Sequence, residues 1–407
     1  MKYAAGISKS EYQKEIASIF YSNTSRGYAD WRQCGSLEMD ICGFLDDACK
    51  TLSEEGRYDD LFDITNKAYA KWSDTDKDDS NGETQGFCSA VQDNWNIIYE
   101  KGESDISHDK MMKWFMSELE NHAVIDYMED DLYDFLLKHF YAPEELQAKL
   151  DLLERAMKAA DTSAYSIPVL ENYYVRVLAD RKAPIEEIRA FVKKSGGYSI
   201  GETLAQIEVE YGNYDAAIDL YQKRIAERPD GYWSNEARKV LIEIYKKIGD
   251  RNKEFEEVTN YLWNNVNSEE AFLQYGSYFT KDEWPTRWEK ILADSRSGYA
   301  YVWCAAEGRY DLVMDMAETE YGSHIVVEYE KKLAALYPER CLVVLIKEAK
   351  SSVTRANKRS DYRYLARDLK CISKYPGGKE AAVKLAGEFA AEYPRRKAML
   401  DELRSFL

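Results

Sequence analysis

Three of the Gly-x-Tyr sequences in this chain of 407 residues stand at equivalent places, as short turns between segments with helical periodicity. The copies lie at Gly56–Tyr58, Gly212–Tyr214 and Gly308–Tyr310, and the first and third stand in the similar contexts SEEGRYDDL and AAEGRYDLV. Glycine permits the left-handed backbone that often ends a helix. The recurrence therefore predicts helical hairpins of similar design along the chain.

One of these hairpins has the residue spacing of a tetratricopeptide unit: helix, short turn, helix and terminating proline. The glycine allows the tight turn, small and aromatic residues after it let the second helix pack on the first, and the proline stops that helix. A looser unit follows and ends at Gly249. We expect the residues that pack the repeats to be Gly56, Tyr58, Leu204, Gly212, Tyr214, Ala217, Tyr221, Pro229, Gly249, Gly308 and Tyr310.

The remainder of the chain also favours helices. Apolar residues recur at intervals of three and four, and no proline precedes Pro143. The best strand candidate, 341–346, leads directly into strong helix formers, so we interpret it as a buried helix. Ser10 and Gln13 have the spacing of a capping box before the first helix. The predicted fold is an all-α, tetratricopeptide-like α-solenoid of stacked helical hairpins.

The chain divides by pattern and charge into three predicted segments. We expect N-terminal helical hairpins over 1–160, central tetratricopeptide-like repeats over 161–339, and a basic helical cap over 340–407. Residues 72–86, WSDTDKDDSNGETQG, are acidic and rich in turn formers, which predicts a solvated loop. Weaker loops are expected at 159–166, 193–199 and 351–360.

The composition of the chain limits where the protein can reside and which partners it can bind. The net charge of −18 opposes a polyanionic partner, although residues 340–407 hold 16 Lys and Arg against 8 Asp and Glu. No segment approaches the roughly 18 apolar residues of a membrane span, and Met1–Ser10 lacks the apolar core of a signal peptide. Seven cysteines without a dense framework favour reduced thiols. We therefore expect a cytoplasmic protein with no membrane partner.

Motifs of catalysis are missing from the sequence. There is no Gly-x-x-x-x-Gly-Lys, Gly-x-Ser-x-Gly or Gly-x-Gly-x-x-Gly motif, which removes the usual signs of nucleotide-dependent enzymes and serine hydrolases. The four histidines match no zinc spacing. They are His108, His122, His139 and His324. We predict no catalytic residue and no cofactor.

Metal binding is weighed at two places. Cys34, Cys42 and Cys49 follow one another at helical intervals, which favours buried packing residues over ligands. The alternating carboxylates of 74–79 could converge on a hard cation, but Asp79 stands where an EF-hand needs glycine and Gln85 where it needs glutamate. A second acidic group, 129–134, suits a helix surface or first turn. We assign no metal ligand, and cation binding by 72–86 stays open.

Several stretches together resemble a known family. They are DWRQCGSLEMDICGFLDDACKTLSEEGRYDDLFDI, DKDDSNGE, the Gly212 hairpin and YPRRKAMLDELRSFL. The chain resembles, over nearly its whole length, the helical region that follows the zinc finger in bacterial SWIM zinc-finger proteins. The finger itself, Cys-x-Cys followed by Cys-x-His, is missing here. The resemblance therefore implies the helical fold and transfers no functional residue.

The leading hypothesis for function is a non-enzymatic scaffold whose helical repeats bind a protein or peptide partner. The alternative is a nucleic-acid-associated accessory module that acts through the basic C-terminal part or with a SWIM-type partner; nucleic acid alone is the less favoured partner. The candidate partner-binding residues are Arg355, Arg359, Arg363, Arg395, Arg396 and Lys397. Their spacing also fits a solvated helix face.

Overall fold

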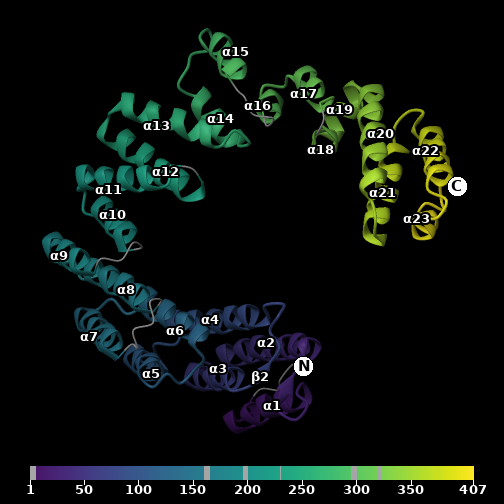
Figure 1. The fold of residues 1–407 in the computed structure, drawn as a ribbon. Helices are drawn as coiled ribbons and strands as arrows, with labels where there is room; N and C mark the ends of the chain where they lie inside the picture. Colours follow the sequence, from purple (N-terminus) through teal and green to yellow (C-terminus); the bar gives the residue numbers. More distant parts are fainter. Residues whose placement is uncertain (1–5, 160–165, 196–199, 230, 295–299, 320–321) are drawn as a thin grey trace. The chain divides into compact units, whose positions relative to one another are not determined.

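The computed structural model describes residues 6–159, 166–195, 200–229, 231–294, 300–319 and 322–407. These ranges contain 23 helices and two strands of two residues each, and most helices pack on neighbours in the sequence (Figure 1). The prediction of an all-α solenoid is confirmed. The contacts divide the chain into two compact units, the N-terminal unit (residues 1–220) and the C-terminal unit (residues 221–407).

The N-terminal unit begins with three helices that pack against α2, and continues with helices that pack on their neighbours in the sequence. Helix α2 contacts α1, α3 and α4, while farther along α8 contacts α7, α9 and α10. The elements are α1 (Lys9–Ser22), β1 (Tyr28–Ala29), α2 (Trp31–Glu54), α3 (Tyr58–Ser73), β2 (Asp76–Lys77), α4 (Glu83–Lys101), α5 (His108–Glu120), α6 (Asp126–Lys138), α7 (Pro143–Ala159), α8 (Ser166–Asp180), α9 (Ile185–Ser195), α10 (Ile200–Glu210) and α11 (Tyr214–Glu227), within which the unit ends.

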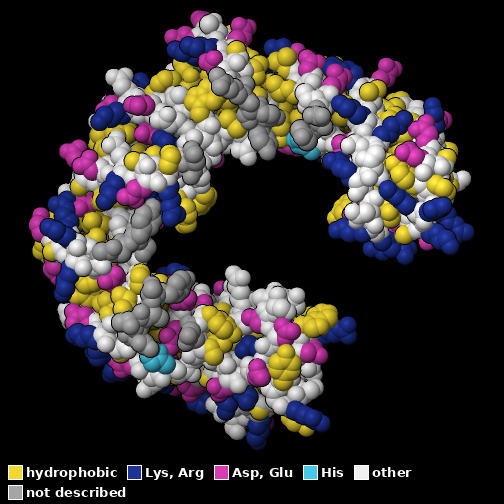
Figure 2. Space-filling view, viewed as in Figure 1, with side chains coloured by type: hydrophobic (Ala, Val, Ile, Leu, Met, Phe, Trp, Pro, Cys, Tyr) yellow, Lys and Arg dark blue, Asp and Glu magenta, His cyan; other side chains and the backbone are white. Residues whose placement is uncertain are grey.

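The C-terminal unit is a further series of helices packed on their neighbours. Its elements are α12 (Tyr232–Ile248), α13 (Arg251–Asn264), α14 (Glu269–Gly276), α15 (Trp284–Asp294), α16 (Tyr301–Ala306), α17 (Tyr310–Ala317), α18 (Ser323–Glu328), α19 (Glu330–Leu336), α20 (Pro338–Arg355), α21 (Arg359–Ile372), α22 (Gly378–Glu392) and α23 (Lys397–Glu402). On the face that Figure 2 shows, Lys and Arg side chains gather over α20–α23. The strand candidate of the sequence lies inside α20, so its interpretation as a helix is confirmed.

The segment boundaries of the structure differ from those expected. The chain divides at residues 220 and 221, inside the segment 161–339 that the sequence treats as one. Residues 340–407 share one hydrophobic cluster with the helices before them, so they do not form a separate core. The expected loop 351–360 is shorter, because residues 351–355 continue α20. The other two weak loops were expected at 159–166 and 193–199. Most of each, residues 160–165 and 196–199, lies outside the described residues.

The predicted turn glycines occupy left-handed backbone at helix ends. Gly56, Gly212 and Gly308 have φ of +67°, +76° and +71°, and Gly249 has +80°. After each of the first three, the next backbone N–H donates to the carbonyl five residues earlier, at 2.8–2.9 Å. This hydrogen bond is the signature of a Schellman motif, and the tyrosine one position farther on begins the following helix.

Two turns of the same kind lack glycine. His122 and Lys182 have φ of +46° and +59°. The next N–H donates to the carbonyl five residues back in both cases, from Ala123 to Glu118 and from Ala183 to Leu178, at 3.0 Å. Left-handed backbone costs about 1 kcal/mol or more for a residue with a Cβ. These two helix ends therefore form the same turn without glycine and carry that cost.

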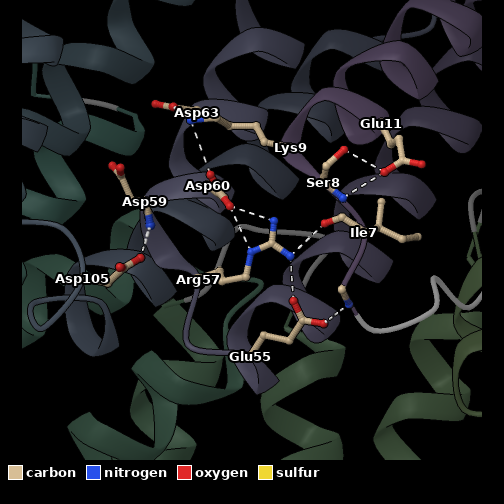
Figure 3. A network of polar contacts seen from close by, with 11 residues as sticks. Ile7, Ser8, Lys9, Glu11, Glu55, Arg57, Asp59, Asp60, Asp63 and Asp105 are labelled. Atoms are coloured by element: carbon tan, nitrogen blue, oxygen red, sulfur yellow. Dashed lines mark hydrogen bonds and ion pairs between the residues drawn. The ribbon is translucent and has the colours of Figure 1, made fainter.

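The Gly56 turn also holds the N-terminal segment in place (Figure 3). The guanidinium of Arg57 donates to Asp60 at 2.8 and 3.0 Å, to Glu55 at 2.7 Å and to the carbonyl of Ile7 at 2.8 Å. Close to it, the N–H and hydroxyl of Ser8 donate to Glu11 at 3.0 and 2.7 Å. The capping box of α1 is thus formed by Ser8 and Glu11, and the predicted pair two residues later, Ser10 with Gln13, is wrong.

In each unit, some of the buried aromatic residues form a connected group. In the N-terminal unit Trp72 stacks on Phe87 with ring centroids 4.4 Å apart, and Trp95 contacts Phe115 edge to face at 4.8 Å. In the C-terminal unit the fully buried Trp303 stacks on Phe272 at 5.8 Å. Large aromatic surfaces of this kind dominate core energetics. Among the described helices, none combines the length and apolar content that crossing a membrane demands.

Candidate functional site

The acidic segment 72–86 is only partly a loop. Trp72 and Ser73 end α3, and Glu83 begins α4, so the connection comprises residues 74–82, which we call the α3–α4 loop. Trp72 is fully buried, and its indole N–H donates to the hydroxyl of Thr84 at 3.0 Å. The prediction of a solvated loop over 72–86 is wrong at both ends, because these side chains belong to the core.

The α3–α4 loop is fastened to the beginning of α2. Its strand β2 pairs in parallel with β1, with Tyr28 opposite Asp76 and Ala29 opposite Lys77. The Lys77 ammonium donates to the carbonyls of Trp72 and Thr75 at 2.7 and 3.1 Å, and burial lowers its pKa. These contacts place the loop between α2 and α4.

A pocket with a volume of about 420 Å³ opens beside the α3–α4 loop. Its walls come from the loop, from α4 and from α6, and they include two carboxylates, two amides and an aromatic ring but no lysine or arginine. The lining residues are Asp79, Gly82, Thr84, Gln85, Cys88, Ser89, Gln92, Tyr127 and Asp131. The pocket is therefore polar and negatively charged.

Asp131 is the carboxylate of this pocket whose pKa is raised by burial. Burial is the main cause that raises its pKa, and a hydrogen bond from Cys88 is the largest opposing effect. The Gln92 amide donates to Asp131 at 2.6 Å. Tyr127 is 54% exposed and presents its ring at the same pocket. The arrangement suits a cation that carries an apolar stem, because carboxylates and an aromatic face stand together.

A second feature lies behind the loop. A thiol sulfur from Cys34, a carboxylate oxygen from Asp79 and one from Glu83 all lie within 4.8 Å of one another. Among the described residues, this is the group of three side chains whose ligand atoms lie close enough together to hold one metal ion. Cys34 comes from the first turn of α2, Asp79 from the loop and Glu83 from the first turn of α4. We call this group the Cys34 cluster.

Two members of the Cys34 cluster are buried, Asp79 is partly exposed, and the cluster lacks a full set of hydrogen bonds. Cys34 is 0% exposed and Glu83 is 9% exposed. One Glu83 oxygen accepts from Asn81 at 3.0 Å, whereas the other, Oε2, is buried with no hydrogen-bond partner among the described residues. The carboxylate of Asp79 accepts from the N–H of Thr84 at 2.9 Å. Burial, followed by the charges of Glu83 and Asp79, raises the pKa of Cys34 to about 11.

The other cysteines and carboxylates named from the sequence lie apart from this cluster. Cys42 and Cys49 lie 8 and 15 residues after Cys34 on the same helix, α2. Burial raises the pKa of each of these two thiols. Asp74 and Asp76 are exposed. The intervals between cysteines and carboxylates in the sequence did not point to Glu83. The β1–β2 pairing that brings the loop to Cys34 covers only two residues in each strand, which is too short to recognise in the sequence.

The histidines and the acidic group 129–134 have local partners. His108 stacks on Tyr99 with ring centroids 4.0 Å apart, and His139 lies 3.0 Å from the amide oxygen of Asn96. His122 contacts Glu129 at 2.8 Å. His324 is exposed and lies edge to face against a tyrosine of α16. His139 also lies against Tyr99, so the rings of His108 and His139 share one neighbour, but no histidine belongs to the group of possible metal ligands found among the described residues.

The predicted basic partner-binding residues are largely engaged within the C-terminal unit. Arg355 pairs with Glu348 at 3.0 Å, and Glu402 binds both Arg359 at 2.7 Å and Arg363 at 3.5 Å. Arg396 lies over the ring of Tyr393 and donates to the carbonyl of Val353 at 2.8 Å. Arg395 and Lys397 are exposed. The six residues are thus not one free surface.

The predicted repeat-packing residues from Leu204 to Gly249 lie in or next to three consecutive helices, α10, α11 and α12. Leu204 of α10 and Ala217 of α11 are buried, and Tyr221, also on α11, is 4% exposed. Pro229 is exposed and follows the end of α11 at Glu227. Gly249 ends α12.

Comparison with known proteins gives no family. No family model matches the chain, and no curated protein matches it. A solved structure described as a "Circular tandem repeat protein with novel repeat topology and enhanced subunit contact surfaces" aligns over 98% of this chain and 94% of its own, with 12% identity and a TM-score of 0.22. A score this low supports no inference about this chain. The resemblance to SWIM zinc-finger proteins stays a prediction.

Proposed function

We propose that this chain is a non-enzymatic, cytoplasmic scaffold of helical repeats, and that its N-terminal unit binds a positively charged segment of a partner protein. The observation that carries the proposal is the acidic pocket beside the α3–α4 loop, which is lined by Asp79 and by the partly buried Asp131. Helical repeats commonly present such extended binding surfaces.

The charge of the surrounding unit supports a cationic ligand. Residues 1–220 hold 23 Lys and Arg against 43 Asp and Glu, a net charge of −20. Residues 59–134, which include the loop, α4 and most of α6, account for 20 acidic and 6 basic residues of these. A field of one sign concentrates ligands of the opposite sign and accelerates their association.

The pocket itself suits the side chain of a lysine or arginine. The ammonium or guanidinium would meet the carboxylates of Asp131 and Asp79, and its aliphatic stem would lie against the exposed ring of Tyr127. A cation also relieves the unfavourable burial of the Asp131 charge, which is the cause of its raised pKa.

Binding of a fluorescein-labelled, Lys- and Arg-rich peptide of about twelve residues tests the proposal by anisotropy at low and physiological salt. Hydrogen bonds to charged groups contribute about 1.5–3 kcal/mol, so Asp131→Asn should weaken binding by roughly tenfold or more. Tyr127→Ala should weaken it by a smaller factor.

The matched control is Asp134→Asn, one turn farther along α6, where the carboxylate is half exposed and pairs with Lys138 at 3.1 Å. It removes the same charge from the same helix and should change affinity little. Equal losses for Asp131→Asn and Asp134→Asn would refute the pocket, and the same affinity for a peptide with norleucine in place of lysine would refute a cationic ligand.

The second candidate is a nucleic-acid-associated role. The observation that favours it is the gathering of Lys and Arg over α20–α23, where Arg395 and Lys397 are exposed (Figure 2). The internal ion pairs of Arg355, Arg359 and Arg363 weigh against it. Electrophoretic shift of single-stranded RNA and duplex DNA at low salt tests it, and a shift unchanged in the Arg395→Glu, Lys397→Glu double variant would exclude this surface.

A further inference from the structure

We propose that Cys34, Asp79 and Glu83 form a binding site for one zinc ion, which clamps the α3–α4 loop between α2 and α4. The three ligand atoms already lie within 4.8 Å of one another. In a tetrahedral zinc site, ligand atoms about 2.0–2.3 Å from the metal are separated by roughly 3.5 Å. The site therefore forms when the three side chains close by about 1 Å.

The burial of the Glu83 carboxylate is the observation that points to a bound ligand. Its Oε2 has no hydrogen-bond partner among the described residues, although the side chain is 91% buried. A buried charged group without a partner is costly, and proteins normally satisfy it with an opposite charge, a donor or a metal. A cation between Glu83, Asp79 and Cys34 satisfies this oxygen and neutralises the two carboxylates together.

The donor set selects the kind of metal. One thiolate with two carboxylates suits a borderline divalent ion such as Zn²⁺, while Ca²⁺ and Mg²⁺ prefer oxygen alone. Asp79 also lines the pocket described above, so a water molecule can reach the fourth position from that side.

The neighbouring charges are compatible with this ion. Three anionic ligands and Zn²⁺ together carry one negative charge, and the Lys77 ammonium lies close enough to the cluster to influence the Cys34 thiol. Lys77 forms no ion pair within 4.0 Å with Asp79 or Glu83 and binds backbone carbonyls instead. It is placed to balance the remaining charge and leaves the three ligand atoms free.

Cobalt and zinc titrations of the full, untagged chain after dialysis against a chelator test the site. We expect one equivalent of Co²⁺ to produce the near-ultraviolet absorption band of a cobalt thiolate, and one equivalent of Zn²⁺ to displace it. Cys34→Ser should remove the band, and Glu83→Gln should weaken zinc binding by roughly tenfold or more in calorimetry. No peptide is present, so failure of the peptide pocket leaves this result unaffected.

The matched control is Cys49→Ser, which changes another buried cysteine of α2 outside the cluster and should bind zinc like the parent chain. Circular dichroism checks that each variant folds; if Cys34→Ser does not fold, Glu83→Gln, which keeps the shape of the side chain, decides. The proposal is overturned by absence of stoichiometric zinc binding at roughly 100 μM, by a cobalt thiolate band that survives Cys34→Ser or disappears in Cys49→Ser, or by unchanged zinc affinity in Glu83→Gln.

Discussion

Asp368 makes the stability of the C-terminal helices depend on pH. This residue of α21 is largely buried, and burial, with a smaller effect from the charge of Glu348, raises its pKa from 3.8 to about 6. Glu348 itself accepts hydrogen bonds from Ser352 and Arg355. Asp368 is therefore a carboxyl that the folded chain prefers to keep protonated.

The sign and size of the effect follow from this shift. Because the folded state has the higher pKa, its stabilisation is full below about pH 4 and is lost as the pH rises through about 6. Two pKa units correspond to about 3 kcal/mol. The side chain keeps some contact with solvent, so we expect a loss of about 1–3 kcal/mol between pH 4 and pH 7. Asp368→Asn should remove this loss and stabilise the chain at pH 7.

Hydrogen exchange followed by mass spectrometry, at pH 5, 6 and 7.5 and corrected for intrinsic exchange, measures the opening free energy of α21 peptides. The wild-type values should fall as the pH rises, and those of Asp368→Asn should stay more nearly constant. Asp401→Asn, an exposed carboxyl in α23, is the control for net charge. Parallel profiles for wild type and Asp368→Asn, or an equal gain from Asp401→Asn, would refute the reasoning.

Three further changes test the packing. Gly212→Val places a β-branched side chain at φ +76° and should lower the free energy of unfolding by about 1–3 kcal/mol, measured by chemical denaturation; an unchanged midpoint would contradict the turn geometry. Arg396→Ala removes a stacked, carbonyl-bound guanidinium and should lower the melting temperature, whereas Arg395→Ala should not; equal melting temperatures would contradict this. Tyr69→Phe deletes the 2.5 Å hydrogen bond to the carbonyl of Met128 and should cost about 1–3 kcal/mol, and a neutral result in the same denaturation assay would show that the carbonyl finds another donor.

The helical turns could be predicted where the cause is local. A glycine has no Cβ and so indicates a residue with left-handed backbone, as at Gly56, Gly212 and Gly308. The tyrosine two residues later begins the next helix. His122 and Lys182 adopt the same backbone without that signal. The residue type does not mark the turn at these positions, so a search for glycine does not reveal these two helix ends.

The candidate site was less accessible to sequence reasoning. The composition of 72–86 predicts a solvated loop, yet Trp72 packs into the core and Glu83 is buried. The Cys34 cluster joins segments more than forty residues apart through the short β1–β2 pair, and its members follow no metal-binding interval. Only the tertiary placement of α2 beside α4 brings Cys34 and Glu83 together.

The separation of the two hydrophobic clusters has a consequence for how the chain is made. Every buried member of the first cluster lies between Tyr12 and Ile207, and the second begins at Ile242. Synthesis proceeds from the N-terminus at about 5–20 residues per second, so the first core can assemble before the second has emerged from the ribosome. The buried members of the first cluster can therefore pack on one another while the C-terminal unit is still being made, which shortens the time during which their apolar surface is available for aggregation.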